Sequence, residues 1–131
     1  MKALKIDHIG IAVKNLQESM AFYELLGLTS TGVEEVAEQK VRVAFFPAGD
    51  SEIELLESTS PDGPIARFIE KNGEGIQHMA LRVENIDATL AELKAKGVRL
   101  LGDIKIGAHG KPVIFIHPKD CNGILMELEQ V

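Results

Sequence analysis

The sequence predicts an α+β fold in which two βαβββ modules follow one another within a single domain. An internal repeat is the first sign, since IDHIGIAVKNLQESMAFYELLGL from Ile6 returns without a gap as IQHMALRVENIDATLAELKAKGV from Ile76. The hydrophobic period also changes from strand to helix in the same order in both copies. Size is the third sign, because 131 residues with 45% apolar side chains suffice for one core and not for two independent ones.

The first module opens with a strand over residues 6–13, where apolar side chains on one face alternate with His8 and small residues on the other. A helix is expected at 16–26, because Asn15 is a good N-cap and apolar residues recur at helical spacing. Gly27 supplies a left-handed stop at its end. The first module therefore begins with a strand followed by a helix.

Three strands complete this module, near 28–36, 40–48 and 51–57, and a turn at 48–50 joins the last two. A linker helix at about 62–73 is predicted to start at Pro64 and to end at Gly73.

The second module repeats the order with its strands and helix displaced by about 70 residues. The repeat places module one at about 4–58 and module two at about 75–131. We expect the strands to form an open, mixed, barrel-like sheet. The elements of module two are a strand at 76–83, a helix at 86–96 between Asn85 and Gly97, and strands near 98–106, 112–117 and 124–129.

Charge and composition narrow the class of function. A net charge of −6 opposes binding to nucleic acid or to an anionic membrane, so a small molecule is the expected partner. The opening MKALKIDHIG does not resemble a signal peptide, and no apolar run is long enough to span a bilayer. These features predict a soluble, cytoplasmic protein. The single cysteine, Cys121, stands outside any CxxC motif, and we interpret it as incidental to the chemistry.

Strand parity predicts a metal site. Glu54 lies between Ile53 and Leu55, so its carboxylate points away from the apolar face of its strand, and Glu127 is flanked in the same way in the second module. His8 and His78 lie on the corresponding faces of the first strand of each module. Two modules related by a pseudo-twofold axis would bring these four side chains together, and we expect His8, Glu54, His78 and Glu127 to bind one metal ion.

The four predicted ligands restrict the type of metal ion, but they do not identify a single metal. Two imidazole nitrogens and two carboxylate oxygens suit Co²⁺, Zn²⁺, Mn²⁺, Ni²⁺ or Fe²⁺. Glu52, Glu57 and Glu129 are competing carboxylates, and strand parity disfavours only Glu57. The acids are 73 residues apart and the histidines 70, so module two must contain three extra residues, which we expect around GAHGK at 107–111.

At these residues the chain resembles the vicinal oxygen chelate superfamily, over nearly the whole of residues 1–131. Within it, DHIGIAV at 7–13, the stretch 60–81 and above all KIGAHGKPVIFIHPKDCNGILMELEQ at 105–130 are similar to methylmalonyl-CoA epimerases. The resemblance implies an isomerase that interconverts the (2R) and (2S) forms of methylmalonyl-CoA by metal-assisted removal and return of the C2 proton. His8, Glu54, His78 and Glu127 fall on the family's metal positions, with Co²⁺ as the first expectation, and Glu127 is also its catalytic base.

The resemblance also exposes a difference. Many relatives have a second catalytic carboxylate at the position of Val43, so the second acid/base group here is open between a metal-bound water, Glu54 and a group of the GAHGK loop. Lys111, His109 and Arg82 are candidates for substrate binding, each weighed against a structural or solvated role. An acyl-CoA thioester is the implied substrate, and exposed sheet edges predict a homodimer.

Two alternatives remain at this stage. One is a metalloenzyme of the glyoxalase I type with the same fold, which the stretch KIGAHGKPVIFIHPKDC at 105–121 argues against. The other is a small-molecule-binding resistance module, which the four retained ligands argue against.

Overall fold

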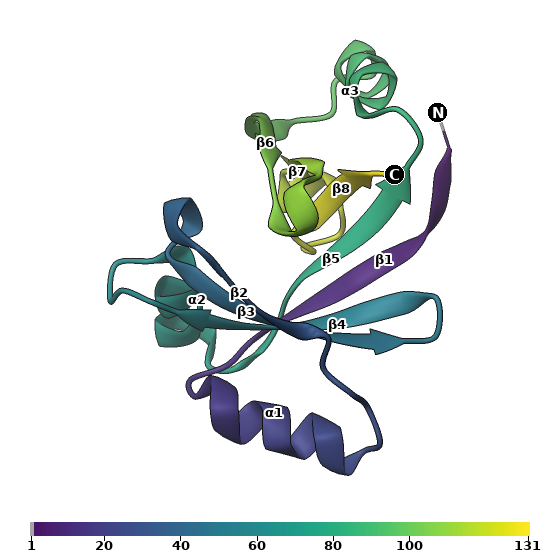
Figure 1. Cartoon of the computed structure of the whole chain (residues 1–131). Helices are drawn as coiled ribbons and strands as arrows, with labels where there is room; N and C mark the ends of the chain where they lie inside the picture. The colour runs from purple at the N-terminus through teal and green to yellow at the C-terminus, as the bar shows by residue number, and fades with distance from the viewer. Residues whose placement is uncertain (1) are drawn as a thin grey trace. The chain divides into compact units, whose positions relative to one another are not determined.

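The computed structural model describes residues 2–131, and Figure 1 shows the order of its elements. Along the chain these are β1 (Ala3–Ala12), α1 (Leu16–Leu25), β2 (Gly32–Val36), η1 (Ala37–Gln39), β3 (Val41–Ala48), β4 (Ser51–Ser58), α2 (Pro64–Asn72), β5 (Gly75–Val83), α3 (Ile86–Ala95), β6 (Leu100–Ile106), η2 (Ala108–Gly110), β7 (Pro112–Ile116), η3 (Pro118–Asp120) and β8 (Met126–Gln130). The α+β class and the two βαβββ modules are confirmed.

The chain forms two compact units. One contains His8–Gln77, which is the first module with α2, and the other contains residues 2–7 together with His78–Val131. The start of β1 therefore groups with the second module, a feature that the tandem order of the sequence does not indicate.

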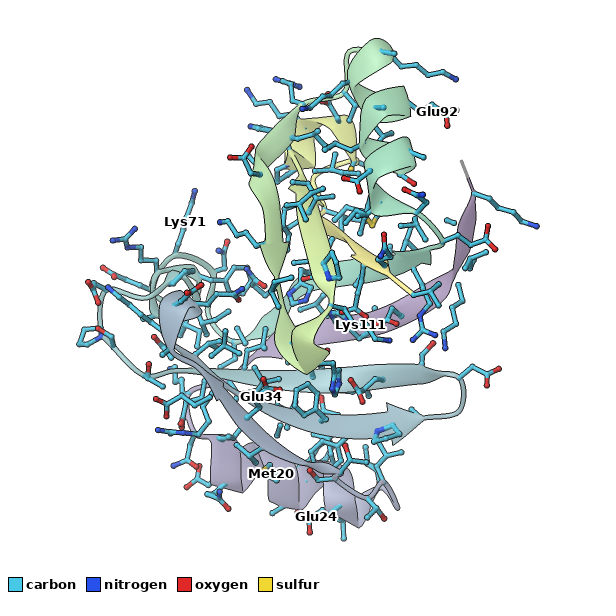
Figure 2. The ribbon with its side chains drawn as sticks, turned by 45° about the horizontal axis from the view of Figure 1, so that its top comes forward. Met20, Glu24, Glu34, Lys71, Glu92 and Lys111 are labelled. Carbon is cyan, nitrogen blue, oxygen red and sulfur yellow. The ribbon has the colours of Figure 1, made fainter. Side chains whose placement is uncertain are left out.

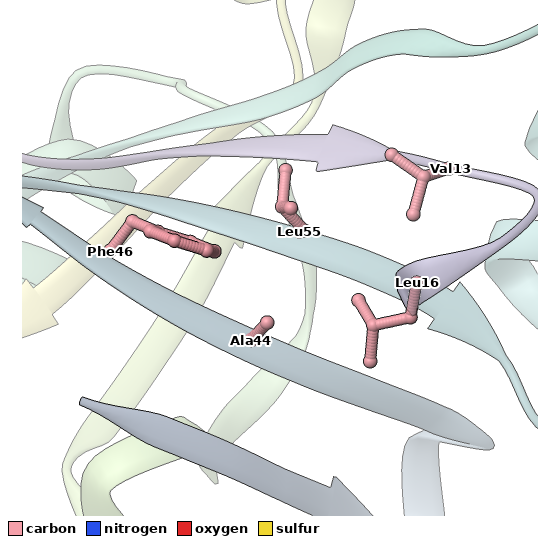
Figure 3. Close-up of a cluster of buried hydrophobic side chains, with 5 residues drawn as sticks. All are labelled: Val13, Leu16, Ala44, Phe46 and Leu55. Atoms are coloured by element: carbon pink, nitrogen blue, oxygen red, sulfur yellow. The ribbon is translucent and has the colours of Figure 1, made fainter. Parts of the chain in front are cut away.

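In the first unit, the strands are ordered β2-β3-β4-β1, with β1 and β4 parallel and the other pairs antiparallel. Helix α1 lies along one face of this sheet (Figure 1). Figure 3 shows the core between them, and Figure 2 shows Met20 and Glu24 on α1. Met20 packs against the core, whereas Glu24 is exposed. The core side chains are Val13, Leu16, Ala44, Phe46 and Leu55.

In the second unit, β5-β8-β7-β6 repeats this arrangement, with β5 and β8 parallel. The β6–β7 register shifts between Leu101 and Lys105, which marks an irregularity that the first module does not share. Its core is formed by Val83, Ile86, Ile114, Ile116 and Leu128. Each group of four strands contains parallel and antiparallel pairs, and the strands of the two groups belong to one eight-stranded mixed sheet, as expected.

The helix boundaries follow the predicted caps. The Asn15 side chain accepts the backbone N–H of Glu18 at 3.0 Å, and the Asn85 side chain accepts that of Ala88 at 2.9 Å. Gly27 and Gly97 adopt φ of 91° and 78°, which favours glycine after each helix. Helices predicted at 16–26 and 86–96 are thus confirmed to within a residue.

The three extra residues of module two lie elsewhere than predicted. Phe45 is opposite Glu54 in the β3–β4 register, and Phe115 is opposite Glu127 in the β7–β8 register. Strand β7 is therefore still at an offset of 70, and the offset reaches 73 only in β8. The insertion lies in the β7–β8 connection, residues 117–125, and the expectation of extra residues around GAHGK was wrong.

Three predicted strands begin later in the structure. The strand expected at 28–36 starts at Gly32, the one expected at 98–106 starts at Leu100, and the one expected at 124–129 starts at Met126. The last delay has a local cause, because Asn122 and Gly123 adopt φ of 58° and 83° and prolong the turn. Among residues 2–131, no helix is both long enough and apolar enough to cross a membrane.

Candidate metal centre

The first histidine–carboxylate pair lies on the two parallel strands of the first unit. His8 on β1 and Glu54 on β4 are both buried, and His8 Nδ1 is 3.3 Å from Glu54 Oε2. Their face of the sheet is the one opposite α1, because Ile11, Val13 and Leu55 on the same strands pack towards the helix. The structure thus brings His8 and Glu54 together within module one.

The second pair has the same position in the second unit. His78 on β5 and Glu127 on β8 are buried, and His78 Nε2 is 3.7 Å from Glu127 Oε1. Leu81, Val83 and Leu128 point instead into the core beneath α3. The two pairs differ in which imidazole nitrogen faces the carboxylate.

Strand register makes the two pairs equivalent. Glu54 lies opposite Gly10, two residues after His8, and Glu127 lies opposite Ala80, two residues after His78. Each histidine thus meets its carboxylate along the same diagonal between parallel strands. The repeat in the sequence is therefore a repeat in side-chain position.

The spacing within each pair suits ligation of a divalent cation. Two ligand atoms bound at about 2.1 Å lie roughly 3.0–3.4 Å apart at octahedral to tetrahedral angles. The separations of 3.3 Å and 3.7 Å are close to this range. Imidazole and carboxylate donors on a buried face are also the chemistry that Co²⁺, Zn²⁺, Mn²⁺ and Ni²⁺ accept. Each unit can therefore offer two adjacent ligands.

An aromatic side chain accompanies each pair and was not singled out in the sequence. The Phe115 ring meets the His78 ring edge to face, with centroids 6.0 Å apart, and Phe115 lies opposite Glu127. Phe45 is buried opposite Glu54 in the first unit. The two phenylalanines are separated by 70 residues, the offset of the repeat, and this spacing could have indicated their equivalence in the sequence. Phe115 restricts the orientation of the His78 imidazole.

Glu57 is occupied by a structural role. Its Oε2 accepts the backbone N–H of Leu16 at 2.9 Å, and its Oε1 accepts Arg42 Nη1 at 2.7 Å. In the second unit, Gln130 Oε1 accepts the N–H of Ile86 at 3.0 Å in the same way. A side chain from the last strand therefore binds the start of each helix, where unpaired N–H groups favour an acceptor. This agrees with strand parity, which disfavoured Glu57 as a ligand.

Arg82 is bound by Asp7. Arg82 Nε and Nη2 donate to Asp7 Oδ1 at 2.8 Å and 2.5 Å. Glu129 lies opposite Arg82 in the β5–β8 register and is buried. The sequence left Arg82 open between substrate binding and a structural salt bridge. The structure contains a salt bridge, and the partner of Arg82 is Asp7 rather than Glu127.

The GAHGK loop joins β6 to β7 and includes Lys111, which Figure 2 shows in this hairpin. The backbone N–H of Gly107 donates to the carbonyl of Lys111 at 2.9 Å and closes the turn. His109 is exposed and adopts φ of 64°, an uncommon backbone conformation for this residue. Gly107 packs against Val113, so that a Cβ at Gly107 would lie 3.0 Å from a Val113 methyl carbon. The side chains of Lys111 and His109 are thus carried on a closed turn.

Val43 lies on the face of the sheet that carries Glu54. Its neighbours Ala44 and Phe46 point into the α1 core, so Val43 points the other way, and it is buried. The position at which the resemblance implies a second carboxylate therefore lies on the Glu54 face of this sheet, and here it is apolar.

Cys121 packs against the second core from the β7–β8 connection. Burial raises the pKa of its thiol, and the neighbouring Asp120 adds to this. A raised pKa lowers the fraction of reactive thiolate, which agrees with a non-catalytic cysteine.

Comparison with known proteins defines the class. The model of the Glyoxalase/Bleomycin resistance protein/Dioxygenase superfamily matches residues 7–115, which is most of the chain. The protein is a member of this superfamily.

Full-length relatives define the family more closely. The chain is 45% identical to the mitochondrial methylmalonyl-CoA epimerase of Homo sapiens over 96% of this chain and 73% of that protein. It is 44% identical to the ethylmalonyl-CoA/methylmalonyl-CoA epimerase of Cereibacter sphaeroides, over 97% and 98% of the two chains. A methylmalonyl-CoA epimerase solved with methylmalonyl-CoA and NH₄⁺ superposes with a TM-score of 0.92 at 38% identity, over 98% of this chain and 95% of that one. The chain therefore belongs to the methylmalonyl-CoA epimerase family. These relatives do not support the glyoxalase I or resistance-module alternatives.

Proposed function

We propose that this protein is a metal-dependent methylmalonyl-CoA epimerase that interconverts the (2R) and (2S) forms of its substrate. The observation that carries the proposal is the equivalence of the two buried His–Glu pairs, found in a chain with epimerase relatives along nearly its full length. An acyl-CoA thioester is the substrate class that these relatives support.

His8, Glu54, His78 and Glu127 are the proposed metal ligands. In the part of the chain that the structure describes, each unit provides one such pair, at His8–Glu54 and His78–Glu127. Two ligands rarely hold a catalytic cation, so we infer that one ion uses both pairs. A divalent cation, when bound, supplies Lewis-acid stabilisation for the negative charge that develops on the substrate oxygens. The buried positions of the four side chains restrict water around that charge.

Glu127 is the proposed general base. The C2 hydrogen lies between a thioester and a carboxylate, so its removal places charge on the neighbouring oxygens and a carboxylate can accept the proton. Phe115 and Ala80, opposite Glu127 on the neighbouring strands, limit where this carboxylate can move. Inversion then requires a proton to return from the opposite face of the substrate.

Val43 has no acid/base group, so it cannot return the proton to the opposite face of the substrate. The group that does so must therefore differ from that of relatives with a carboxylate at the Val43 position. Glu54 and a group of the GAHGK loop are the protein candidates, and a metal-bound water is the third. We propose His109 and Lys111 as substrate contacts in that loop, where Lys111 would neutralise a substrate carboxylate or phosphate.

Three further features belong to the proposal. Co²⁺ is the expected metal, with Zn²⁺, Mn²⁺ and Ni²⁺ as alternatives of the same donor preference. A homodimer is expected from the sheet edges. The cytoplasm is the expected compartment.

Solvent exchange tests the proposal. Methylmalonyl-CoA is incubated in D₂O with chelator-treated protein and with protein reloaded with Co²⁺, and deuterium at C2 is followed by mass spectrometry. We expect incorporation only in the reloaded sample, and a loss of about 10²-fold or more in Glu127→Gln.

A matched control distinguishes loss of the Glu127 base from the general effect of removing one carboxylate charge. Glu57→Gln makes the same chemical change on the helix side of β4, at a position where the second module has Gln130. This variant should exchange deuterium as the wild type does. Metal-loaded wild type without C2 exchange would refute the proposal.

A further inference from the structure

Asp7, Arg82 and Glu129 form a charged group within the second unit. Arg82 uses two nitrogens on one oxygen of Asp7, and it faces Glu129 across the β5–β8 register. Asp7 and Glu129 are 6% and 3% exposed, whereas the Arg82 side chain is 29% exposed. Two buried carboxylates thus share the neighbourhood of one arginine that reaches towards solvent.

The fold does not require this group. In the repeat, the positions of Asp7, Arg82 and Glu129 correspond to Gln77, Ala12 and Leu56. At each of these three positions, the other module builds the same strand with an uncharged residue. Buried charges are costly and rarely persist for stability alone, so three charges whose equivalents in the repeat are all uncharged indicate a specific role.

The group lies next to three of the proposed metal ligands along the chain. Asp7 immediately precedes His8, Glu129 follows Glu127 by two residues on the same face of β8, and Arg82 follows His78 by four on the same face of β5. The salt bridge from Arg82 to Asp7 therefore restrains the chain at the residue that precedes His8.

We propose that Arg82 is a positioning residue, which acts through Asp7 to hold His8 in place for the metal ion. The inference rests on the proposed function, because it takes His8 as a ligand. Groups that orient ligands commonly change metal affinity by about 10- to 100-fold when they are removed. Arg82 is thereby distinguished from a residue that binds the substrate anion, which would act on substrate affinity and need no Asp7.

Metal affinity provides a readout that is independent of turnover. Co²⁺ dissociation constants are measured by competition with a chromophoric chelator for wild type, Asp7→Asn, Arg82→Gln and the double variant. We expect each single variant to bind Co²⁺ about 10-fold or more weakly. The double variant should be no weaker than the singles, because both remove one interaction. Arg82→Lys, which keeps the charge, should recover part of the affinity.

The control is another Arg–Asp pair of the same unit. Arg99 donates to both carboxylate oxygens of Asp120 away from the ligand-bearing strands, so Arg99→Gln should leave the Co²⁺ affinity unchanged. Circular dichroism confirms that each variant is folded, and Asp7→Asn and Arg82→Lys keep the test valid if Arg82→Gln does not fold.

Steady-state kinetics separates the two roles of Arg82. Saturated with Co²⁺, Asp7→Asn and Arg82→Gln should retain the wild-type KM. A raised KM in Arg82→Gln alone, with unchanged Co²⁺ affinity in both variants, would overturn the inference in favour of substrate binding. If wild type itself neither bound Co²⁺ nor exchanged the C2 proton, the proposed function would fail instead.

Discussion

His109 carries a backbone conformation that its side chain disfavours. Its φ of 64° and ψ of 9° lie in the left-handed region, which costs an L-residue about 1–2 kcal/mol, whereas glycine is tolerated there. Strain of this kind is commonly retained where a side chain is used. The exposed imidazole of His109 is therefore a better candidate for substrate contact than exposure alone suggests.

Substitution at this position measures the strain directly. His109→Gly and His109→Ala both remove the imidazole, but only glycine relieves the backbone. We expect His109→Gly to be more stable than His109→Ala by about 1 kcal/mol in urea unfolding. Equal stability of the two variants would show that the turn is not strained. If His109 contacts substrate, both variants should lose activity together.

Glu54 and Glu57 stand three residues apart on opposite faces of β4, and this separates their roles. Glu54→Gln replaces a charged ligand with a neutral one, so Co²⁺ affinity should fall by about 10-fold or more while the protein stays folded. Glu57→Gln should leave Co²⁺ affinity unchanged and reduce stability by only about 0.3–1 kcal/mol, through the start of α1. Equal Co²⁺ affinities in a titration would argue against Glu54 as a ligand.

Residue faces were readable from the sequence, whereas contacts between distant residues were not. Strand alternation placed His8, Glu54, His78 and Glu127 on the faces opposite the helices because a strand turns each successive side chain over. The Asp7–Arg82 salt bridge joins residues 75 positions apart. No local period marks such a partner, and Arg82 had several carboxylates to choose from.

At the scale of elements, the β7–β8 connection is held by an ion pair. Arg99 donates to Asp120 through its backbone N–H and two guanidinium nitrogens, at 2.8, 3.1 and 2.8 Å. These hydrogen bonds from Arg99 lower the pKa of the Asp120 carboxyl from 3.8 to about 2. The connection that contains the three extra residues is thus tied back to the residue preceding β6.

The lowered pKa gives a signed pH dependence. Because the folded state favours the ionised carboxylate, its contribution to stability is complete above pH 4 and is lost as the pH falls towards 2. Thermal unfolding of wild type and Asp120→Asn should therefore differ at pH 6 and converge towards pH 2. High salt should reduce the difference, since the pair is largely exposed. A difference in melting temperature that persisted unchanged at pH 2 would contradict this assignment.

The first N–H groups of α1 and α3 are bound by two kinds of side chain: one close in the sequence and one distant in the sequence. Asn15 and Asn85 were predicted as caps because the acceptor lies three residues from its donor. Glu57 and Gln130, which bind the first helical N–H groups from the last strand of each module, were not predicted. Their separation from these donors is 41 and 44 residues, so only the register of the sheet brings them there.

Asn15→Ala and Asn85→Ala should each reduce the free energy of unfolding by about 1 kcal/mol. The second acceptor at each helix start remains in both variants, so α1 and α3 should persist in the folded protein. Urea unfolding followed by circular dichroism measures both quantities. A loss of helical signal in the native baseline would show that the strand side chains cannot hold the helix starts alone.

For the molecule as a whole, the repeat predicted the fold correctly, but it did not determine where the three extra residues of module two lie. Offsets of 70 and 73 between equivalent residues required three extra residues somewhere before Glu127, and the glycines of GAHGK made that loop an attractive place. Register showed instead that β7 keeps the offset of 70. Strand pairing fixes the position of the insertion, because the pairing shows which residue of β7 lies opposite each residue of β8. A gapless comparison of β1 and β5 does not contain this information.

Metal binding should couple the stability of the protein to both modules. Since a ligand that binds only the folded state stabilises it by RT ln(1 + [L]/Kd), Co²⁺ at 100 times its dissociation constant should add about 2.7 kcal/mol, or roughly 10 °C in Tm, over chelator-treated protein. His8→Ala and His78→Ala should each abolish most of this shift. His117→Ala, which alters a histidine that accepts the N–H of Lys119, should retain it. If either ligand variant kept the full shift, the cation would be bound by one module alone, and the equivalence of the two His–Glu pairs would be structural rather than functional.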